Sequence, residues 1–393
     1  MSSPRKYVQG VGVLREIGTH TTELGDRPMV LSDKMVLSLF RDLVERSFGE
    51  RDATCFIEEF HGECSHSEID RLTEIGKRER VDILVGLGGG KALDTAKAVA
   101  HHLGAPIVMA PTVASTDAPT SSVSVIYDQG HVFSEALYLN RNPDLVLVDT
   151  EVIAKAPVRF FMAGVGDAFS KKYEVEACFR SSGLNTHNAH GPLLALELAR
   201  LTHRIVVRHG LSAKAAAEKH VVTPALESVV ETVVLHSGLA FENGGLAAAH
   251  SIADGLTSLE GAHRSMHGEL VAFGTITQLI LERRPLRIIQ RAIGFCKSLG
   301  LPTTLAELGV TETKNGELMK VAERSCLRGK PIHNMYFPVT PKMVRDAIAA
   351  ADDLGSAFSL RHGGRSSKAR VNQSRQTKDQ ASIDELSKTR RRR

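Results

Sequence analysis

A cluster of glycines between a predicted strand and a predicted helix is the first feature of this sequence that could do chemistry. Four glycines fall within five residues, at Gly86, Gly88, Gly89 and Gly90. The apolar run 81–85 before them predicts a buried strand, and a helical pattern begins at Lys91. A helix that starts directly after a strand presents unpaired backbone N–H groups, and glycines let a pyrophosphate approach them. The stretch therefore predicts a nucleotide-phosphate site, with a tight turn that binds nothing as the alternative.

This turn matches neither of the two common nucleotide motifs. Counted from Gly86, the last glycine of G-x-G-x-x-G would fall on Lys91. In a Walker A loop, Val85 stands where the first glycine belongs, and Ala92 replaces the Ser or Thr that binds magnesium. We therefore expect a nucleotide phosphate in a variant loop.

Three separated residues, Asp167, His250 and His267, could hold a metal ion. One carboxylate and two imidazoles suit zinc or ferrous iron and leave a coordination position open for a substrate. Asp167 is expected at the start of a helix, and His267 at a junction between a loop and a helix. Spacing alone does not decide the matter, because the chain has seventeen histidines. His187 and His190, expected three residues apart on a helix, fit the pattern as well, although a structural role is the simpler interpretation of that pair.

Two acids follow predicted strands. Asp33 comes just after the short strand 28–31, where a carboxylate can bind the adenosine ribose hydroxyls and exclude a 2′-phosphate, or can cap the helix expected over 36–45. Asp117 lies in the hydroxyl-rich loop 111–122, after the strand expected over 106–110. Loops at the carboxyl ends of parallel strands are where such sheets bind ligands. This loop is therefore either a ligand site or a plain polar loop.

The chain divides into three regions that differ in composition and in the pattern of apolar residues. Apolar runs alternate with helical patterns over residues 1–157, which is typical of βαβ units and a parallel sheet. Over 158–358, segments rich in alanine and leucine repeat at helical period and predict an all-α domain. Residues 359–393 are polar and basic and cannot bury enough apolar surface to fold alone. The fold class expected is an α/β dinucleotide-binding domain, then an all-α metal-binding domain, then a disordered tail.

Several helix boundaries in these domains can be predicted. The expected helices of the second domain include 188–208, 212–238, 244–256 and 313–326, and Thr150 is expected to cap a short helix that stops near Pro157.

The positive net charge of the chain comes from its basic tail, and the part expected to fold is mildly acidic. The formal net charge is +4, but residues 361–393 carry eleven Lys and Arg against three Asp and Glu. Subtraction leaves residues 1–360 at about −4, so the basic net charge of the whole chain is no indication of nucleic-acid binding by the folded part. The tail itself is either a tether to nucleic acid or another acidic surface, or a dispensable extension.

Cysteine usage and the apolar runs indicate the compartment. Five scattered cysteines without C-x-x-C spacing predict reduced thiols and a cytoplasmic protein. No apolar run approaches the length of a membrane span, and the N-terminus lacks the apolar core of a signal peptide. We therefore expect no membrane partner.

Several motifs together resemble those of the iron-containing alcohol dehydrogenase superfamily. They are Gly-Gly-Gly-Lys-x-x-Asp at 88–94, PTVASTDAPTSSVSVIY at 111–127, Gly-x-Gly-Asp at 164–167 and the two histidine contexts. The loop at 111–127 is similar to that of the glycerol dehydrogenases in particular. The resemblance runs from Lys6 to Leu354 and leaves the tail outside. It implies the dehydroquinate synthase-like fold, with the reaction in the cleft between two domains, and a homo-oligomer, an octamer.

The resemblance also implies an activity: NAD-dependent, reversible oxidation of glycerol to dihydroxyacetone, with hydride passing from C2 of the polyol to nicotinamide C4. It implies zinc bound by Asp167, His250 and His267, and substrate hydroxyls held at that centre and by Asp117. The NAD contacts that it implies are Asp33, Gly88, Gly89, Gly90, Lys91, Asp94, Thr112, Val113, Ala114, Ser115, Ser121, Val123 and Tyr127.

One departure from the superfamily bears on the metal. Iron-dependent members often have a fourth ligand, a histidine four residues after the aspartate, and here that position is Lys171. The departure favours Zn²⁺ over Fe²⁺.

Three other functions stay open. The first is a glycerol-1-phosphate dehydrogenase or another polyol dehydrogenase of the superfamily, although the Asp117 carboxylate would repel a phosphate ester. The second is a lyase resembling dehydroquinate synthase, which uses NAD transiently. The third is a non-catalytic binding protein that acts through its basic tail.

Overall fold

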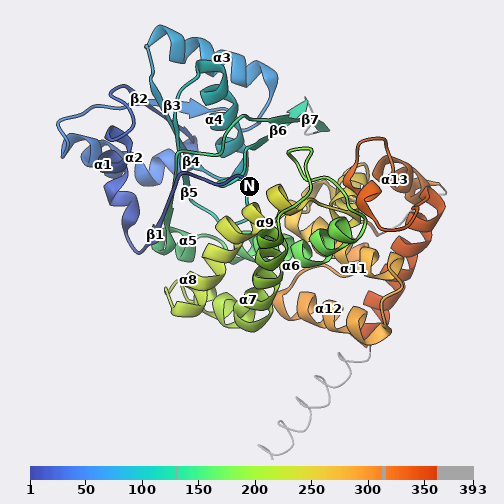
Figure 1. The fold of residues 1–393 in the computed structure, drawn as a ribbon. Coiled ribbons are helices and arrows are strands. Elements are labelled where there is room, and N and C mark those ends of the chain that lie inside the picture. The colour runs from blue at the N-terminus through green and yellow to red at the C-terminus, as the bar shows by residue number, and fades with distance from the viewer. Residues whose placement is uncertain (129–131, 312–315, 361–393) are drawn as a thin grey trace, which may run out of the picture.

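The computed structural model describes residues 1–128, 132–311 and 316–360. Figure 1 shows a sheet covered by helices at the upper left and a helical part at the lower right. Two predictions fall outside the described residues: the start of the helix expected over 313–326, and the basic tail 361–393.

A six-stranded parallel sheet forms the first part, in the order β1-β8-β5-β4-β2-β3. Its strands are β1 (Lys6–Gly10), β2 (Pro28–Asp33), β3 (Phe56–Phe60), β4 (Ile83–Gly88), β5 (Ile107–Pro111) and β8 (Leu145–Asp149). Between β5 and β8 the chain forms a separate antiparallel pair, β6 (Val123–Asp128) and β7 (Val132–Tyr138). The parallel sheet predicted from the alternation of apolar runs and helical patterns is therefore confirmed.

Helices cover both faces of this sheet, because its strands are apolar on both sides. Along β4, Leu84 packs into one core with α3 (His66–Arg78) and α4 (Gly90–Leu103). Its neighbours Ile83 and Val85 pack into a second core, with α1 (Ile17–Thr22) and α2 (Lys34–Gly49). The strand period of two thus places successive residues in different cores.

Helices make up the rest of the described chain. They are α5 (Thr150–Lys155), α6 (Val158–Arg180), α7 (Leu193–Glu218), α8 (Pro224–Glu231), η2 (Thr232–His236), α9 (Ser237–Gly244), α10 (Ala248–Leu256), α11 (His267–Leu281), α12 (Leu286–Leu299), α13 (Glu317–Ser325) and a last helix over 341–360. Short 3₁₀ turns lie at Val13–Glu16, Glu260–Arg264, Ala306–Leu308 and Pro331–Asn334. None of the described helices combines the length and hydrophobicity of a membrane span. The α/β-plus-helical fold class is confirmed, and the boundary between residues 157 and 158 stays a prediction.

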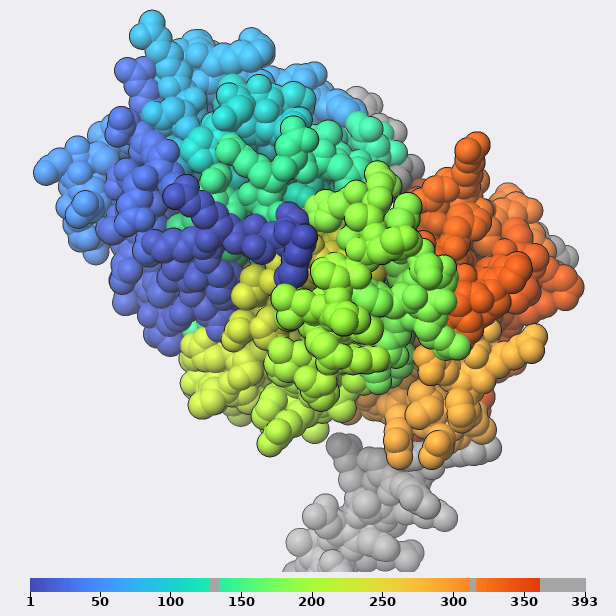
Figure 2. All heavy atoms as spheres, in the orientation of Figure 1, coloured from blue at the N-terminus to red at the C-terminus, as the bar shows by residue number. Residues whose placement is uncertain are grey.

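The N-terminal segment joins the two parts. The Ser2 backbone N–H donates to Asn243 Oδ1 at 2.6 Å, and Asn243 Nδ2 donates back to the Ser2 carbonyl at 2.9 Å. Figure 2 shows this dark-blue segment reaching across the surface from the α/β part onto the helical part.

Three local predictions are wrong. The cap of α5 is Asp149, whose carboxylate accepts from the backbone N–H groups of residues 151 and 152, and Thr150 is already helical. Two helices are expected over 188–208 and 212–238. Instead, α7 runs without interruption over Leu193–Glu218, and the helical structure breaks only after it. The second helix restarts at Pro224, because proline has no N–H and fits the first turn of a helix. His187 and His190 lie in the loop before α7, not on a helix.

The backbones of α6 and α11 approach very closely where Asp167 and His267 lie. A methyl group on Gly268 would stand 1.8 Å from the Ala163 carbonyl oxygen, and one on Gly166 would stand 2.6 Å from the Gly268 carbonyl oxygen. Only hydrogen fits at these positions, so glycine sets the distance between the two helices.

We expect Gly268→Ala to lower the free energy of unfolding by about 1–3 kcal/mol, because the added methyl must push α11 away from α6. Thermal or denaturant unfolding measures the change. Gly49→Ala at the end of α2 is the control, since nothing lies within 4 Å of a methyl group there. Equal stability of the two variants would contradict the close helix contact.

Candidate active site

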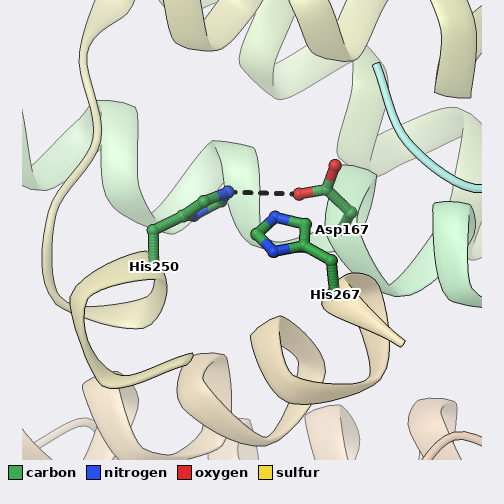
Figure 3. Close-up of side chains that lie close together, drawn as sticks. All are labelled: Asp167, His250 and His267. Carbon is green, nitrogen blue, oxygen red and sulfur yellow. Dashed lines mark ion pairs between the residues drawn. The ribbon is translucent and has the colours of Figure 1, made fainter. Parts of the chain in front are cut away.

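Three side chains from three helices converge on one point. Asp167 lies in the interior of α6, His250 on α10, and His267 at the first position of α11. One ligand atom from each lies within 4.8 Å of the others, and His250 Nε2 is 3.2 Å from Asp167 Oδ1. Figure 3 shows the three side chains pointing toward one another. The expectation that Asp167 starts a helix is wrong, because α6 begins at Val158 and runs past it.

The buried Glu174 orients His250. Its Oε2 lies 2.5 Å from His250 Nδ1, and its Oε1 accepts from the backbone N–H groups of Ala247 and His250 at 3.1 and 3.0 Å. A carboxylate beside Nδ1 keeps a proton on that nitrogen, so Nε2 is the nitrogen that faces Asp167 and that can give up its proton to a metal ion. This is the arrangement that a metal-binding histidine needs. Sequence reasoning did not single out Glu174, although it lies seven residues after Asp167 and therefore on the same face of α6.

The pKa shifts of these groups follow from burial and charge. Burial lowers the pKa of His250, but the charge of Glu174 and the hydrogen bonds to Asp167 and Glu174 together outweigh it and raise the pKa to about 9. Burial raises the pKa of Asp167, but Lys171 and His250 outweigh that effect and hold the pKa well below its usual range. For His267, burial and the nearby positive charges of His250 and Lys171 lower the pKa, so its imidazole is neutral near neutral pH.

This donor set fits a divalent metal ion. It offers one ionised carboxylate oxygen, one neutral imidazole and one imidazole whose Nε2 is directed inward by its partner. These are three ligands of the kind found in open zinc sites. Among the residues that the structure describes, this is the one group of His, Cys, Asp and Glu side chains close enough to share an ion.

Lys171 also belongs to this cluster. Its side chain is 1% exposed, and its Nζ lies 2.5 Å from Asp167 Oδ1 and 3.1 Å from His250 Nε2. The same Nζ is 3.3 Å from Asp117 Oδ2. Lys171 lies four residues after Asp167 on α6, and this spacing places the two side chains next to each other. That it also reaches His250 and Asp117 could not be read from the sequence.

Asp117 is placed by contacts from the helical part. Its Oδ2 accepts from Ser237 Oγ at 2.7 Å, and the Thr120 hydroxyl donates to the Val234 carbonyl oxygen. Val234 lies in η2, a single π-helical turn, and Ser237 follows at the first position of α9. A π-turn leaves carbonyl groups turned out of the regular helix ladder and recurs at functional sites. The turn therefore helps hold the loop that carries Asp117 beside the cluster of Asp167, His250 and His267.

The glycine turn lies at the carboxyl ends of β2, β4 and β5, as the sequence predicts. Gly88 has φ +150°, a conformation that favours glycine, and a methyl group there would stand 3.6 Å from Asp33 Oδ2. Methyl groups on Gly89 and Gly90 would stand 3.6 Å from Val113 and Thr116, respectively. Asp33 Oδ1 caps α2 by accepting from the Val36 N–H at 3.0 Å, which leaves Oδ2 beside the turn.

Two predicted cofactor residues have protein partners. Asp94 Oδ1 lies 2.9 Å from Lys97 Nζ, and its Oδ2 accepts from the Val125 N–H at 3.3 Å. Lys97 also donates to the carbonyl oxygens of Ala118 and Val123. The buried Asp94–Lys97 pair thus fixes both ends of the segment that holds Ser121. Lys91 Nζ lies 2.7 Å from Glu63 Oε2 and over the ring of Tyr127.

Comparison with known proteins gives the family. Residues 4–150 match the model described as iron-containing alcohol dehydrogenase. A glycerol dehydrogenase of Citrobacter freundii is 45% identical over 92% of this chain and 99% of its own length. The chain belongs to the iron-containing alcohol dehydrogenases.

Two further proteins also match along nearly the whole chain. A glycolaldehyde reductase of Halobacterium salinarum is 44% identical over 90% of this chain and 97% of its own. The crystal structure of glycerol dehydrogenase from Schizosaccharomyces pombe superposes with a TM-score of 0.89 at 36% identity, covering 92% of each chain.

We expect Glu174→Gln to weaken zinc binding by about 10–100-fold, because the amide no longer fixes the proton on His250 Nδ1. Competition with a chromophoric chelator measures the affinity. Glu176→Gln on the same helix is the control, since Glu176 instead pairs with Arg200 at 3.1 Å. Matching zinc affinities in the two variants would rule out the orienting role of Glu174.

Proposed function

We propose that this chain catalyses the reversible, NAD-dependent oxidation of glycerol to dihydroxyacetone at a zinc ion bound by Asp167, His250 and His267. The observation that carries the proposal is the convergence of these three side chains beside Asp117. The 45% identity to a glycerol dehydrogenase along nearly the whole length of both chains supports glycerol as the substrate.

Zinc is proposed over iron because of the ligand set. Three protein ligands with an open position are typical of catalytic zinc, and the position where iron-dependent relatives often have a fourth ligand is Lys171. When bound, the metal supplies a Lewis acid that lowers the pKa of the reacting hydroxyl, and NAD accepts the hydride.

The chain's own residues orient the substrate and exclude competing ones. Asp117 is buried and accepts from Ser237, so its carboxylate is held in one position and can accept hydrogen bonds from polyol hydroxyls. The same negative charge disfavours a phosphate ester or a carboxylate.

The cofactor is proposed to lie along the glycine turn. Its pyrophosphate would meet the N-terminus of α4, where the cap residue Gly89 has no side chain to hydrogen-bond the first N–H groups of this helix. Asp33 would bind the adenosine ribose, with Oδ2 facing Gly88. The segments Thr112–Ser115 and Ser121–Tyr127 complete the proposed contacts, with the buried Asp94 acting through Lys97.

A second candidate substrate is glycolaldehyde. The Halobacterium salinarum relative named for its reduction is 44% identical to this chain. The two activities share their chemistry, because each interconverts a carbonyl and an alcohol beside a neighbouring hydroxyl.

Location and assembly are also proposals. All five cysteines are free thiols, which supports a cytoplasmic protein. The family resemblance supports a homo-oligomer, an octamer.

We expect a chelator to abolish NADH formation from glycerol, and zinc to restore it, because the alcohol is then no longer polarised. The zinc-loaded protein should oxidise NADH with dihydroxyacetone and not with dihydroxyacetone phosphate, as absorbance at the NADH band reports. The rate of NADH oxidation with glycolaldehyde, measured in parallel, shows whether glycolaldehyde or dihydroxyacetone is the better substrate. Full activity in a metal-free sample, or a preference for the phosphate, would refute the proposal.

We expect Asp33→Ser to reduce the preference for NAD over NADP, since serine removes the charge that repels a 2′-phosphate. Serine keeps an oxygen that can cap α2, so stability should change little. Initial rates with each cofactor measure the preference. An unchanged ratio of kcat/KM for NAD and NADP would show that Asp33 serves as a cap alone.

A further inference from the structure

The ammonium group of Lys171 lies on the same atoms that the proposed metal would use. Its Nζ is 2.5 Å from Asp167 Oδ1 and 3.1 Å from His250 Nε2, and these two atoms are themselves 3.2 Å apart. His250 has no other nitrogen to offer, because Nδ1 faces Glu174 at 2.5 Å. Lys171 and a metal ion therefore need the same two electron-pair donors.

A metal ion and an ammonium group cannot hold these atoms together. Zinc binds nitrogen and oxygen at about 2.0–2.2 Å, so an ion there would stand within about 4 Å of the present Nζ. Two cations at that separation repel strongly in a buried site. Binding of the ion must move the ammonium group.

Asp117 provides the place to which the ammonium group can move. Its Oδ2 is 3.3 Å from Lys171 Nζ and is held by Ser237 Oγ at 2.7 Å. The ring of Phe241 lies 5.3 Å from the same Nζ. The lysine side chain has a flexible four-carbon stem, so its ammonium group can shift without moving the helix.

We propose that Lys171 competes with the metal for Asp167 and His250, and that metal binding transfers its ammonium group to Asp117. This inference rests on the proposed metal centre. Lys171 weakens metal affinity and keeps the buried carboxylates compensated in the metal-free protein. It also couples the metal site to the carboxylate proposed to hold the substrate.

The test is zinc affinity in the full-length protein, measured by competition with a chromophoric chelator after metal removal. Lys171→Met, which keeps the length and removes the charge, should bind zinc at least about tenfold more tightly. Lys172→Met is the matched control on the same helix, because its Nζ lies over the Tyr173 ring and outside the cluster. Lys171→Gln keeps hydrogen-bond donors for both carboxylates and replaces the Met variant if that variant does not fold without metal.

Asp117→Asn tests the transfer. This change should weaken zinc binding more in the wild-type background than in Lys171→Met, because only the wild type needs a new partner for its ammonium group. Equal losses in both backgrounds would overturn the transfer to Asp117.

The competition by Lys171 and the metal centre itself can be refuted separately. Unchanged or weaker zinc binding in both Lys171→Met and Lys171→Gln would overturn the competition while leaving the metal centre intact. A wild-type protein that binds no divalent ion would overturn the proposed metal centre and this inference with it.

Discussion

The burial of the Asp167 carboxylate is the constraint on which the rest of the site depends. Asp167 is 1% exposed in the interior of α6. An unpaired charge in such a place costs several kcal/mol, so positive groups must reach it. Lys171 comes from the next turn of the same helix and His250 from α10, and the neutral His267 joins them from α11. Glu174, one turn further along α6, holds His250 in turn. One face of a single helix therefore specifies the charges around the site.

Such a cluster can form only if the surrounding backbones come very close. Gly164 lies against the Ala114 carbonyl, where a methyl group would stand 2.2 Å from the oxygen, and Gly166 lies against α11. The sequence Gly-x-Gly-Asp thus brings the loop that follows β5 to one side of Asp167 and the helix that carries His267 to the other. The glycines set the distances between the backbones, and these short distances bring the charged side chains beside them into contact.

Buried polar contacts fix the loop carrying Asp117 between the sheet and the helical part. Glu242, which is fully buried, accepts from the Ser122 N–H at 2.9 Å and from Asn142 Nδ2 at 2.5 Å. Lys97 holds the same loop from the sheet side. Buried networks with satisfied partners favour one arrangement over its neighbours. Asp117 and the cluster of Asp167, His250 and His267 consequently keep a fixed relation although they come from different parts of the chain.

The sequence by itself determined the parallel sheet, the helical second part, the glycine turn and the residue types of the site. Strand and helix periods are local properties, and the motif order identified the superfamily. Local signals misplaced the start of the helix around Asp167, because a charged residue inside a buried helix looks like a terminus until its partners are known. Only the tertiary structure decided which of seventeen histidines meet Asp167, that Glu174 orients one of them, and that Lys171 shares their atoms. These contacts join residues up to about a hundred positions apart, and no periodicity along a chain encodes which distant helices will cross.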